Sequence, residues 1–131
     1  MRFETRDAGD PSLTGPYDLV TAFECIHDMS DPVAALAAMR RLAKPGGNVI
    51  VMDERTNERF STAENPVEQL LYGFSILGCL PAGMAATPSA ATGTVMRPHT
   101  LRRYARRAGF DEIEILPIQN DFFRFYRLRA K

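Results

Sequence analysis

Two apolar runs separated by one amphipathic segment dominate the middle of the chain. The runs are YDLVTAF (17–23) and NVIVMDE (48–54), and acidic residues follow the first and close the second. Short β-rich runs bounded by turn residues are typical of strands buried in a parallel sheet. Parallel strands need a long crossover, and the segment between the runs has helical spacing. The sequence therefore predicts a β-α-β unit with two parallel strands and a right-handed crossover.

The predicted crossover helix has clear signals at both ends. Asp31 is suited to N-cap the helix, and Pro32 takes the first helical position, where its missing N–H costs nothing. Lys44 lies near the C-terminus, where the helix dipole favours a cation, and the P-G-G run at 45–47 is a stop signal. We therefore expect a helix that begins at Pro32 and ends at the P-G-G run.

The segments outside this unit extend the α/β order. Residues 2–8 alternate weakly and are predicted to form a short strand. Residues 99–109 form an amphipathic pattern that ends in glycine, with four arginines expected to face solvent. Residues 110–118 and 122–130 alternate as strands, and the short turn between them predicts antiparallel pairing. The result is a mostly parallel sheet that ends in an antiparallel hairpin.

An insertion at about 55–97 interrupts this order. Asn65 and Glu68 have the spacing of a capping box, and residues 67–80 are apolar on nearly every helical face. Residues 81–98 form a long run of small residues, and loops of that length are often functional lids. We therefore predict a helical lid over a binding site.

Composition limits the classes of protein to consider. The chain has 131 residues, 45% hydrophobic and 24% charged, with sixteen basic and sixteen acidic side chains. One globular domain is expected, and the zero net charge favours neither nucleic acid nor an anionic membrane as a partner. No apolar run approaches the roughly 20 residues of a membrane span, and the polar N-terminus indicates no signal peptide. Two distant cysteines and two histidines predict no metal site, and free thiols favour a cytoplasmic protein.

Several segments in this order resemble a known family. They are YDLVTAFECIHDMSDP, LAKPGG, NVIVMDE, LRRYARRAGFDEIEIL and NDFFRFYRLRA. Together they are similar to the C-terminal two-thirds of a class I S-adenosylmethionine-dependent methyltransferase of the small-molecule type. The resemblance implies a partial Rossmann-like fold with strands 3, 4, 5, 6 and 7 of that family. It also implies that residues 1–131 form a single incomplete domain.

One hallmark of the family is missing from the sequence. The family has an acidic residue followed by G-x-G-x-G after its first strand and another acidic residue after its second, and neither feature occurs here. The glycine loop brings backbone N–H groups and a helix N-terminus close to the cofactor. We therefore expect the chain to be truncated, to begin at strand 3 of the family, and to bind S-adenosylmethionine poorly or not at all.

The resemblance assigns cofactor contacts to four residues. Asp7 stands where the family hydrogen-bonds the adenine amino group, and the backbone N–H of Ala8 would reach a ring nitrogen. The backbone at Ala22 and Phe23 would contact the amino-acid part of the cofactor. The residues also have plainer interpretations, because Asp7 suits an exposed turn and Phe23 suits a hydrophobic core.

His27 and Glu24 are the candidate catalytic residues. HDMSD is similar to the HDWSD of plant-type small-molecule O-methyltransferases, in which the histidine is the general base. An imidazole near neutral pKa can accept a proton as a methyl group is transferred. His27 could instead shape the strand-to-helix turn, pack near the cofactor, or be an exposed turn residue. Asp28 could orient the ring or interact with the helix dipole, and Glu24 could face a cleft or solvent.

Further candidates lie after the second strand and in the apolar helix. Asp53 and Glu54 are expected on the substrate side of the cleft or in a hydrated turn. Tyr72, Phe74 and Cys79 could line an apolar pocket, pack in the core or form a dimer face.

Two hypotheses of different classes follow. The first is the C-terminal part of a methyltransferase that transfers a methyl group from the cofactor sulfonium to a small, partly hydrophobic molecule, with a homodimer as its expected assembly. The second is a non-catalytic α/β module that self-associates through an open sheet edge or the apolar helix. Whether the chain is itself an enzyme stays open at this point, and a receiver-like signalling domain is disfavoured by the final hairpin.

Overall fold

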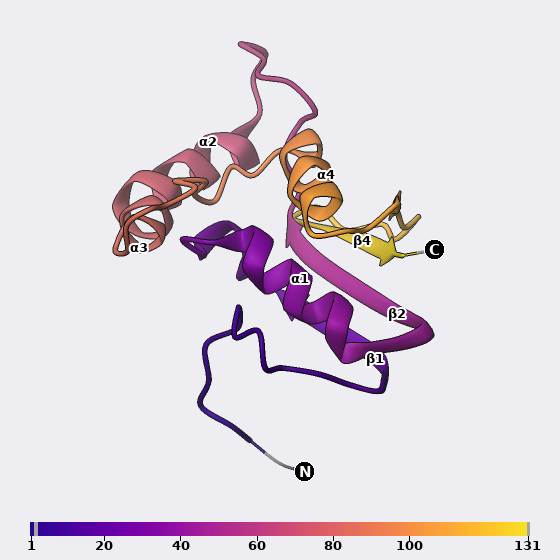
Figure 1. The fold of residues 1–131 in the computed structure, drawn as a ribbon. Coiled ribbons are helices and arrows are strands. Elements are labelled where there is room, and N and C mark those ends of the chain that lie inside the picture. The colour runs from indigo at the N-terminus through magenta and orange to yellow at the C-terminus, as the bar shows by residue number, and fades with distance from the viewer. Residues whose placement is uncertain (2, 131) are drawn as a thin grey trace.

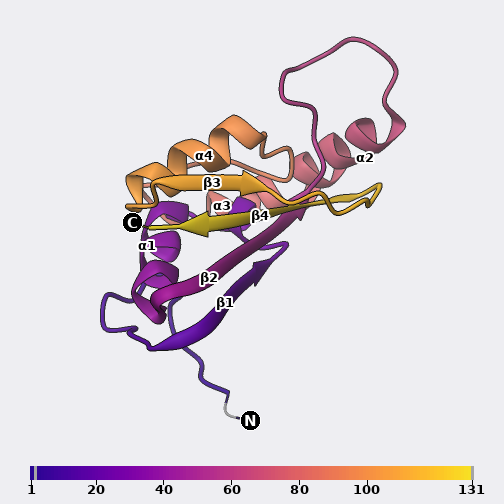
Figure 2. The same ribbon diagram turned by 90° about the vertical axis from the view of Figure 1, so that its right-hand side faces the viewer.

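The computed structural model describes Met1 and residues 3–130 and contains one four-stranded sheet with the order β1-β2-β4-β3 (Figures 1 and 2). The strands are β1 (Tyr17–Phe23), β2 (Ala43–Glu54), β3 (Glu112–Ile115) and β4 (Phe123–Arg129). The α-helices are α1 (Pro32–Leu42), α2 (Pro66–Phe74), α3 (Leu80–Gly83) and α4 (Pro98–Arg107). A 3-10 turn (Ile26–Asp28) follows β1, and a π-helical turn (Ser75–Cys79) joins α2 to α3.

The predicted β-α-β unit is confirmed. β1 and β2 pair in parallel, and α1 connects them. The Asp31 side chain accepts a hydrogen bond from the Ala34 N–H at 2.9 Å, as an N-cap does. The helix ends at Leu42, before the P-G-G run, because those residues belong to β2. They coincide with an irregularity in the pairing, where the register shifts between Tyr17 and Leu19.

The C-terminal hairpin is also confirmed, in shorter strands than the alternation predicted. β4 pairs antiparallel with both β2 and β3, so the last strand lies between them. Gly109 ends the preceding helix with a φ of 91°, a conformation that favours glycine.

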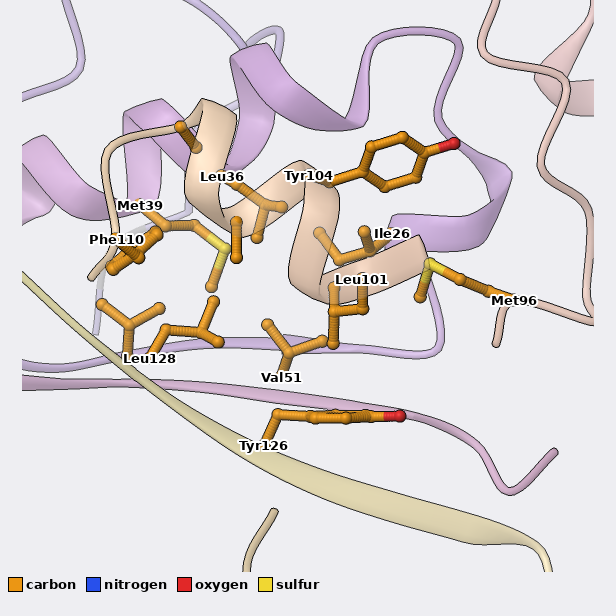
Figure 3. Close-up of a cluster of buried hydrophobic side chains, with 13 residues drawn as sticks. Ile26, Leu36, Met39, Val51, Met96, Leu101, Tyr104, Phe110, Tyr126 and Leu128 are labelled. Carbon is orange, nitrogen blue, oxygen red and sulfur yellow. The ribbon is translucent and has the colours of Figure 1, made fainter. Parts of the chain in front are cut away.

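The hydrophobic core lies on one face of the sheet. Val51 of β2 and Tyr126 and Leu128 of β4 point toward Leu36 of α1 and Leu101 of α4, as Figure 3 shows. Figure 2 shows α1 and α4 behind the sheet, on the same face. On the opposite face, Leu19 and Phe23 of β1 stay largely exposed, whereas Ile50 and Met52 of β2 are half-buried.

The strand predicted over residues 2–8 is wrong for the described part. Residues 3–8 form no strand, and residue 2 lies outside the described residues. A strand needs a neighbour to satisfy its backbone, and in the described chain β1 pairs with β2 alone. The sheet therefore contains the counterparts of four of the five expected family strands.

The apolar helix predicted over 67–80 is confirmed, and the structure extends it. α2, the π-helical turn and α3 follow one another without a break from Pro66 to Gly83. Asn65 caps α2 by accepting from the Glu68 N–H at 3.1 Å. In Figure 2 α2 lies beyond the end of β2, and Leu77 on this stretch is highly exposed.

Candidate functional site

The carboxyl ends of β1 and β2 lie side by side and carry the polar candidates. Phe23 and Met52 are partners in the parallel register, and the Glu24 N–H donates to the Met52 carbonyl at 2.9 Å. Glu24 has a φ of 50°, which is uncommon for a residue other than glycine. This constrained turn directs the chain into the 3-10 turn that carries His27, at the edge where open α/β sheets bind ligands.

His27 is surrounded by carboxylates. Its side chain is 2% exposed, so the interpretation as an exposed turn residue is wrong. The Nδ1 atom lies 2.8 Å from Oδ1 of Asp53 and 3.0 Å from Oε2 of Glu54. The Nε2 atom lies 3.2 Å from Oδ1 of Asp28. Acidic oxygens near both ring nitrogens stabilise the positively charged form of this buried imidazole.

The neighbouring carboxylates control the protonation of this cluster. Burial lowers the pKa of His27, but hydrogen bonds from the ring to Asp53 and Glu54 outweigh it and raise the pKa to about 11. Burial raises the pKa of Asp53 to about 7, against the opposing effect of His27. For Glu54, burial is outweighed by the His27 hydrogen bond, which lowers the pKa. The carboxylates therefore favour the protonated form of His27, which has no lone pair with which to accept a proton.

Sequence reasoning did not foresee the pairing of His27 with Asp53 and Glu54. The residues are far apart in the chain, and each was assigned a role separately. The available signal was the predicted parallel pairing, because neighbouring parallel strands end at the same sheet edge. The Asp28 interpretation as an orienting residue agrees with its distance from the ring.

A cavity of about 450 Å³ opens beside this cluster. It is lined by the polar residues Glu24, His27, Asp28, Glu54 and Thr94, together with Leu70, Leu71, Phe74, Cys79, Phe122 and Phe123. Phe74 and Cys79 thus line an apolar pocket, which was one of their predicted roles. Tyr72 is not among the lining residues, and its hydroxyl accepts a hydrogen bond from Arg97 at 2.9 Å.

The four residues assigned to the cofactor do not lie together in one cavity. Asp7 and Ala8 line a separate cavity of about 770 Å³ with residues at the start of α1, and Asp7 Oδ1 accepts from the Gly9 N–H at 2.7 Å. Ala22 packs against the core, whereas Phe23 is 55% exposed, so the core interpretation of Phe23 is wrong. The two cavities share no lining residue. The described residues therefore fit only fragments of an S-adenosylmethionine site, and the cofactor contacts stay predictions.

The histidine cluster also has the composition of a cation site. His27, Asp53 and Glu54 each offer a ligand atom, and these atoms lie within 4.8 Å of one another. The same holds for His27, Asp28 and Cys79. The hydrogen bond between His27 and Asp53 and the close contacts of the ring with Glu54 and Asp28 bring these oxygens together around the imidazole.

Comparisons with known proteins identify the family. The sequence profile described as "Methyltransferase domain" matches residues 2–115. The chain belongs to this family of S-adenosylmethionine-dependent, small-molecule methyltransferases. It is 33% identical over 106 residues to the ubiquinone/menaquinone biosynthesis C-methyltransferase UbiE of Ralstonia pickettii (strain 12J), covering 75% of this chain and 41% of that protein. It is 31% identical over 121 residues to the ubiquinone biosynthesis O-methyltransferase of Thiobacillus denitrificans (strain ATCC 25259 / T1), covering 88% and 46%.

Solved structures show the same fold. TnmH superposes with a TM-score of 0.73 at 19% identity, over 99% of this chain and 35% of that chain. A structure described as PigF with SAH gives a TM-score of 0.64 at 19% identity, over 95% and 34%. The Rossmann-like methyltransferase fold is therefore confirmed, and the chain spans less than half the length of these relatives. In the described residues no helix combines the length and apolar character needed to cross a bilayer.

Proposed function

We propose that this chain is the C-terminal part of a small-molecule methyltransferase and carries its acceptor-binding side. The observation that carries this proposal is the cavity of about 450 Å³ at the carboxyl ends of β1 and β2. It combines an apolar wall from α2 and the π-helical turn with acidic groups at the sheet edge. Ligands of open α/β sheets bind at this edge, and a mostly apolar pocket with a few polar groups is typical of a small-molecule site.

Methyl transfer from S-adenosylmethionine needs few catalytic groups from the protein. S-adenosylmethionine supplies a methyl group on a sulfonium, which is already a good leaving group. The protein's main tasks are then to align the acceptor and to exclude water. Leu71, Phe74 and Phe123 would exclude water from the cavity.

We assign different roles to the two catalytic candidates. Glu24 lines the cavity as a carboxylate on a constrained turn, so it is the residue proposed to take a proton from the acceptor. His27 is proposed to position Asp28 and Glu54, because its ring lies between their carboxylates. This positioning role differs from the turn-shaping and cofactor-packing alternatives considered from the sequence, and the raised pKa of His27 favours it over the general base.

The proposal is tested by two calorimetric titrations of the whole chain. The neutral ligand 2-naphthylmethanol should bind, and Leu70→Arg should weaken that binding at least about tenfold, since an arginine would enter the apolar wall. Leu77→Arg is the matched control, because Leu77 is exposed on the same helical stretch and does not line the cavity. Equal loss in both variants, or absence of binding by both this ligand and its amine analogue 2-naphthylmethylamine, would contradict an acceptor site here.

The second titration uses S-adenosylhomocysteine. We expect no micromolar binding, because these 131 residues include no acidic residue followed by G-x-G-x-G. Clear micromolar binding would overturn the proposal that this chain alone is weak or inactive toward the cofactor.

A specific observation supports the second candidate function, a self-associating module. In the described chain β1 has β2 as its one neighbour, and Leu19 and Phe23 on this edge strand are more than half exposed. Open edges recruit other strands, so a second copy of this chain is proposed to pair there as a homodimer. Light scattering should show a dimer that Leu19→Lys dissociates. A wild-type monomer at high micromolar concentration would contradict this proposal.

The cysteines support a cytoplasmic location. Cys25 and Cys79 are both free thiols, which suits a reducing compartment. Fractionation of cells that produce the chain should recover it with cytoplasmic markers, and recovery with the membrane fraction would contradict this.

A further inference from the structure

The charges that line the 450 Å³ cavity are unbalanced. Glu24, Asp28 and Glu54 supply three carboxylates, and His27 is the sole basic side chain among the described lining residues. Three negative charges against one positive charge leave an excess of two. Positive charge on a ligand would be attracted there, because a cavity with apolar walls strengthens the interaction between charges.

Arginines close to the cavity in sequence or space have other partners. Arg97 forms an ion pair with Glu68, in which Nη1 lies 2.8 Å from Oε1, and Arg124 donates to the Thr56 carbonyl at 2.8 Å. Arg55 donates to the Asn120 carbonyl at 2.7 Å. These contacts give each guanidinium group a partner that does not line the cavity, and none of the three arginines is among the lining residues.

A buried hydroxyl gives a second, independent indication of a ligand. Thr94 lines the cavity, is 2% exposed, and its Oγ1 atom has no hydrogen-bond partner. Leaving such a group unpaired carries a desolvation penalty that a hydrogen bond from a ligand would remove. Together with the carboxylates of Glu24, Asp28 and Glu54, it makes the polar side of the cavity rich in acceptors. A protonated amine offers three N–H donors and no acceptor, and it is the complementary group.

The other wall fits the remainder of such a ligand. Leu70, Leu71 and Phe74 come from α2, and Phe122 and Phe123 lie at the start of β4 with ring centroids 6.5 Å apart. Aliphatic side chains favour an apolar body, and aromatic faces also attract cations.

We propose that the acceptor recognised by this cavity is an amphipathic amine, with its ammonium group at Glu24, Asp28, Glu54 and Thr94 and its apolar body against α2 and Phe123. This inference rests on the proposed function and names its substrate class. It concerns recognition of the ammonium group and leaves the atom that receives the methyl group unassigned.

The test compares two isosteric ligands in calorimetric titrations of the whole chain at low salt. We expect 2-naphthylmethylamine, a cation at pH 7, to bind at least about tenfold more tightly than the neutral 2-naphthylmethanol. Added salt should reduce the difference, because exposed parts of the interaction are screened. Glu24→Gln and Asp28→Asn should each reduce it several-fold. Glu112→Gln, an exposed acid on β3 outside the cavity, is the matched control.

The outcomes separate this inference from the proposed function. Equal binding of both ligands, or an amine preference that is unchanged in both variants, contradicts the proposal that the acceptor is an amine. The proposal that the cavity binds the acceptor is then unaffected. Binding of neither ligand overturns the proposed function as well. S-adenosylmethionine is also a cation and could occupy the same cavity, so it is titrated as a third ligand. If it competes with the amine and binds more tightly in a manner that depends on Glu24, the cavity belongs to the methyl donor and the inference is wrong.

Discussion

The two faces of the sheet are built from the same strands and have different surroundings. On the face covered by α1 and α4, Leu128 is fully buried at 0% exposure. On the opposite face, Leu19 is 57% exposed, although it lies in a strand of the same sheet. Alternate residues of β1 and β2 are apolar on both faces, as in strands that are buried on both sides. The apolar pattern thus indicates that either face of these strands could be buried. The position of the helices decides which face of the sheet is buried.

The largest expected effect on the free energy of unfolding comes from a substitution on the covered face of the sheet. Leu128→Ala should lower the free energy of unfolding by about 2–5 kcal/mol, because it leaves a cavity among fully buried neighbours. Leu19→Ala, the same chemical change on the open face, should cost less than about 0.5 kcal/mol. Urea denaturation of both variants measures the difference. Similar losses in both variants would mean that the open face is buried in solution.

The next effect concerns the polar end of the covered face, where Asp53 continues the alternation of Val49 and Val51. The raised pKa of His27, about 11, means that its contribution to stability is present below its unfolded pKa of about 6.5 and is lost as pH rises toward 11. From pH 7.5 to 10 the stability advantage of the wild type over His27→Gln should shrink, by up to about 1.4 kcal/mol per pH unit.

The measurement for His27 is urea denaturation at each pH. Groups remote from the cluster are present in both proteins, so their effects cancel in the difference. Asp53 does not cancel, because removal of His27 raises the Asp53 pKa further and makes the measured difference smaller than the His27 contribution alone. A constant difference between the wild type and His27→Gln would show that the ring is neutral in the folded protein.

A smaller effect concerns the helix that covers the sheet. Asp31→Ala removes the N-cap of α1 and should cost about 1 kcal/mol. Asp31→Asn keeps an acceptor oxygen at the cap and should cost much less. Thermal denaturation followed by circular dichroism compares the two variants. Equal destabilisation by both would assign the effect to the charge at the helix N-terminus and not to the hydrogen bond.

The smallest expected effect on the free energy of unfolding comes from a substitution on the open face of the sheet. Leu19→Lys should change the free energy of unfolding of the monomer by less than about 0.5 kcal/mol, because the side chain is already in contact with solvent. The same variant is expected to dissociate the dimer, so stability and association are measured together. A loss of more than 2 kcal/mol at concentrations where the wild type is monomeric would show that Leu19 is needed inside the fold.

Local patterns predicted most of the fold, because the interactions that form these elements are close in sequence. The side chains of Asp31 and Asn65 start helices by accepting from N–H groups three residues further on, and Pro32 has no N–H to satisfy. The strand over 2–8 failed because a strand is stabilised by a neighbour, and its weak alternation gave no information about one. The helix ends at Leu42, before the predicted P-G-G stop, because β2 begins at Ala43, which pairs with Tyr17 of β1.

The sequence by itself determined the β-α-β unit, the closing hairpin, the caps and the resemblance to methyltransferases, because each depends on short-range spacing or on a linear motif. Only the tertiary structure decided the surroundings of His27. Its partners Asp53 and Glu54 come from the next strand of the sheet, and their oxygens around one buried ring set its charge. The tertiary structure likewise separated Asp7 and Ala8 from the acidic cavity, because cavities form where segments meet across the sheet edge and not along the chain.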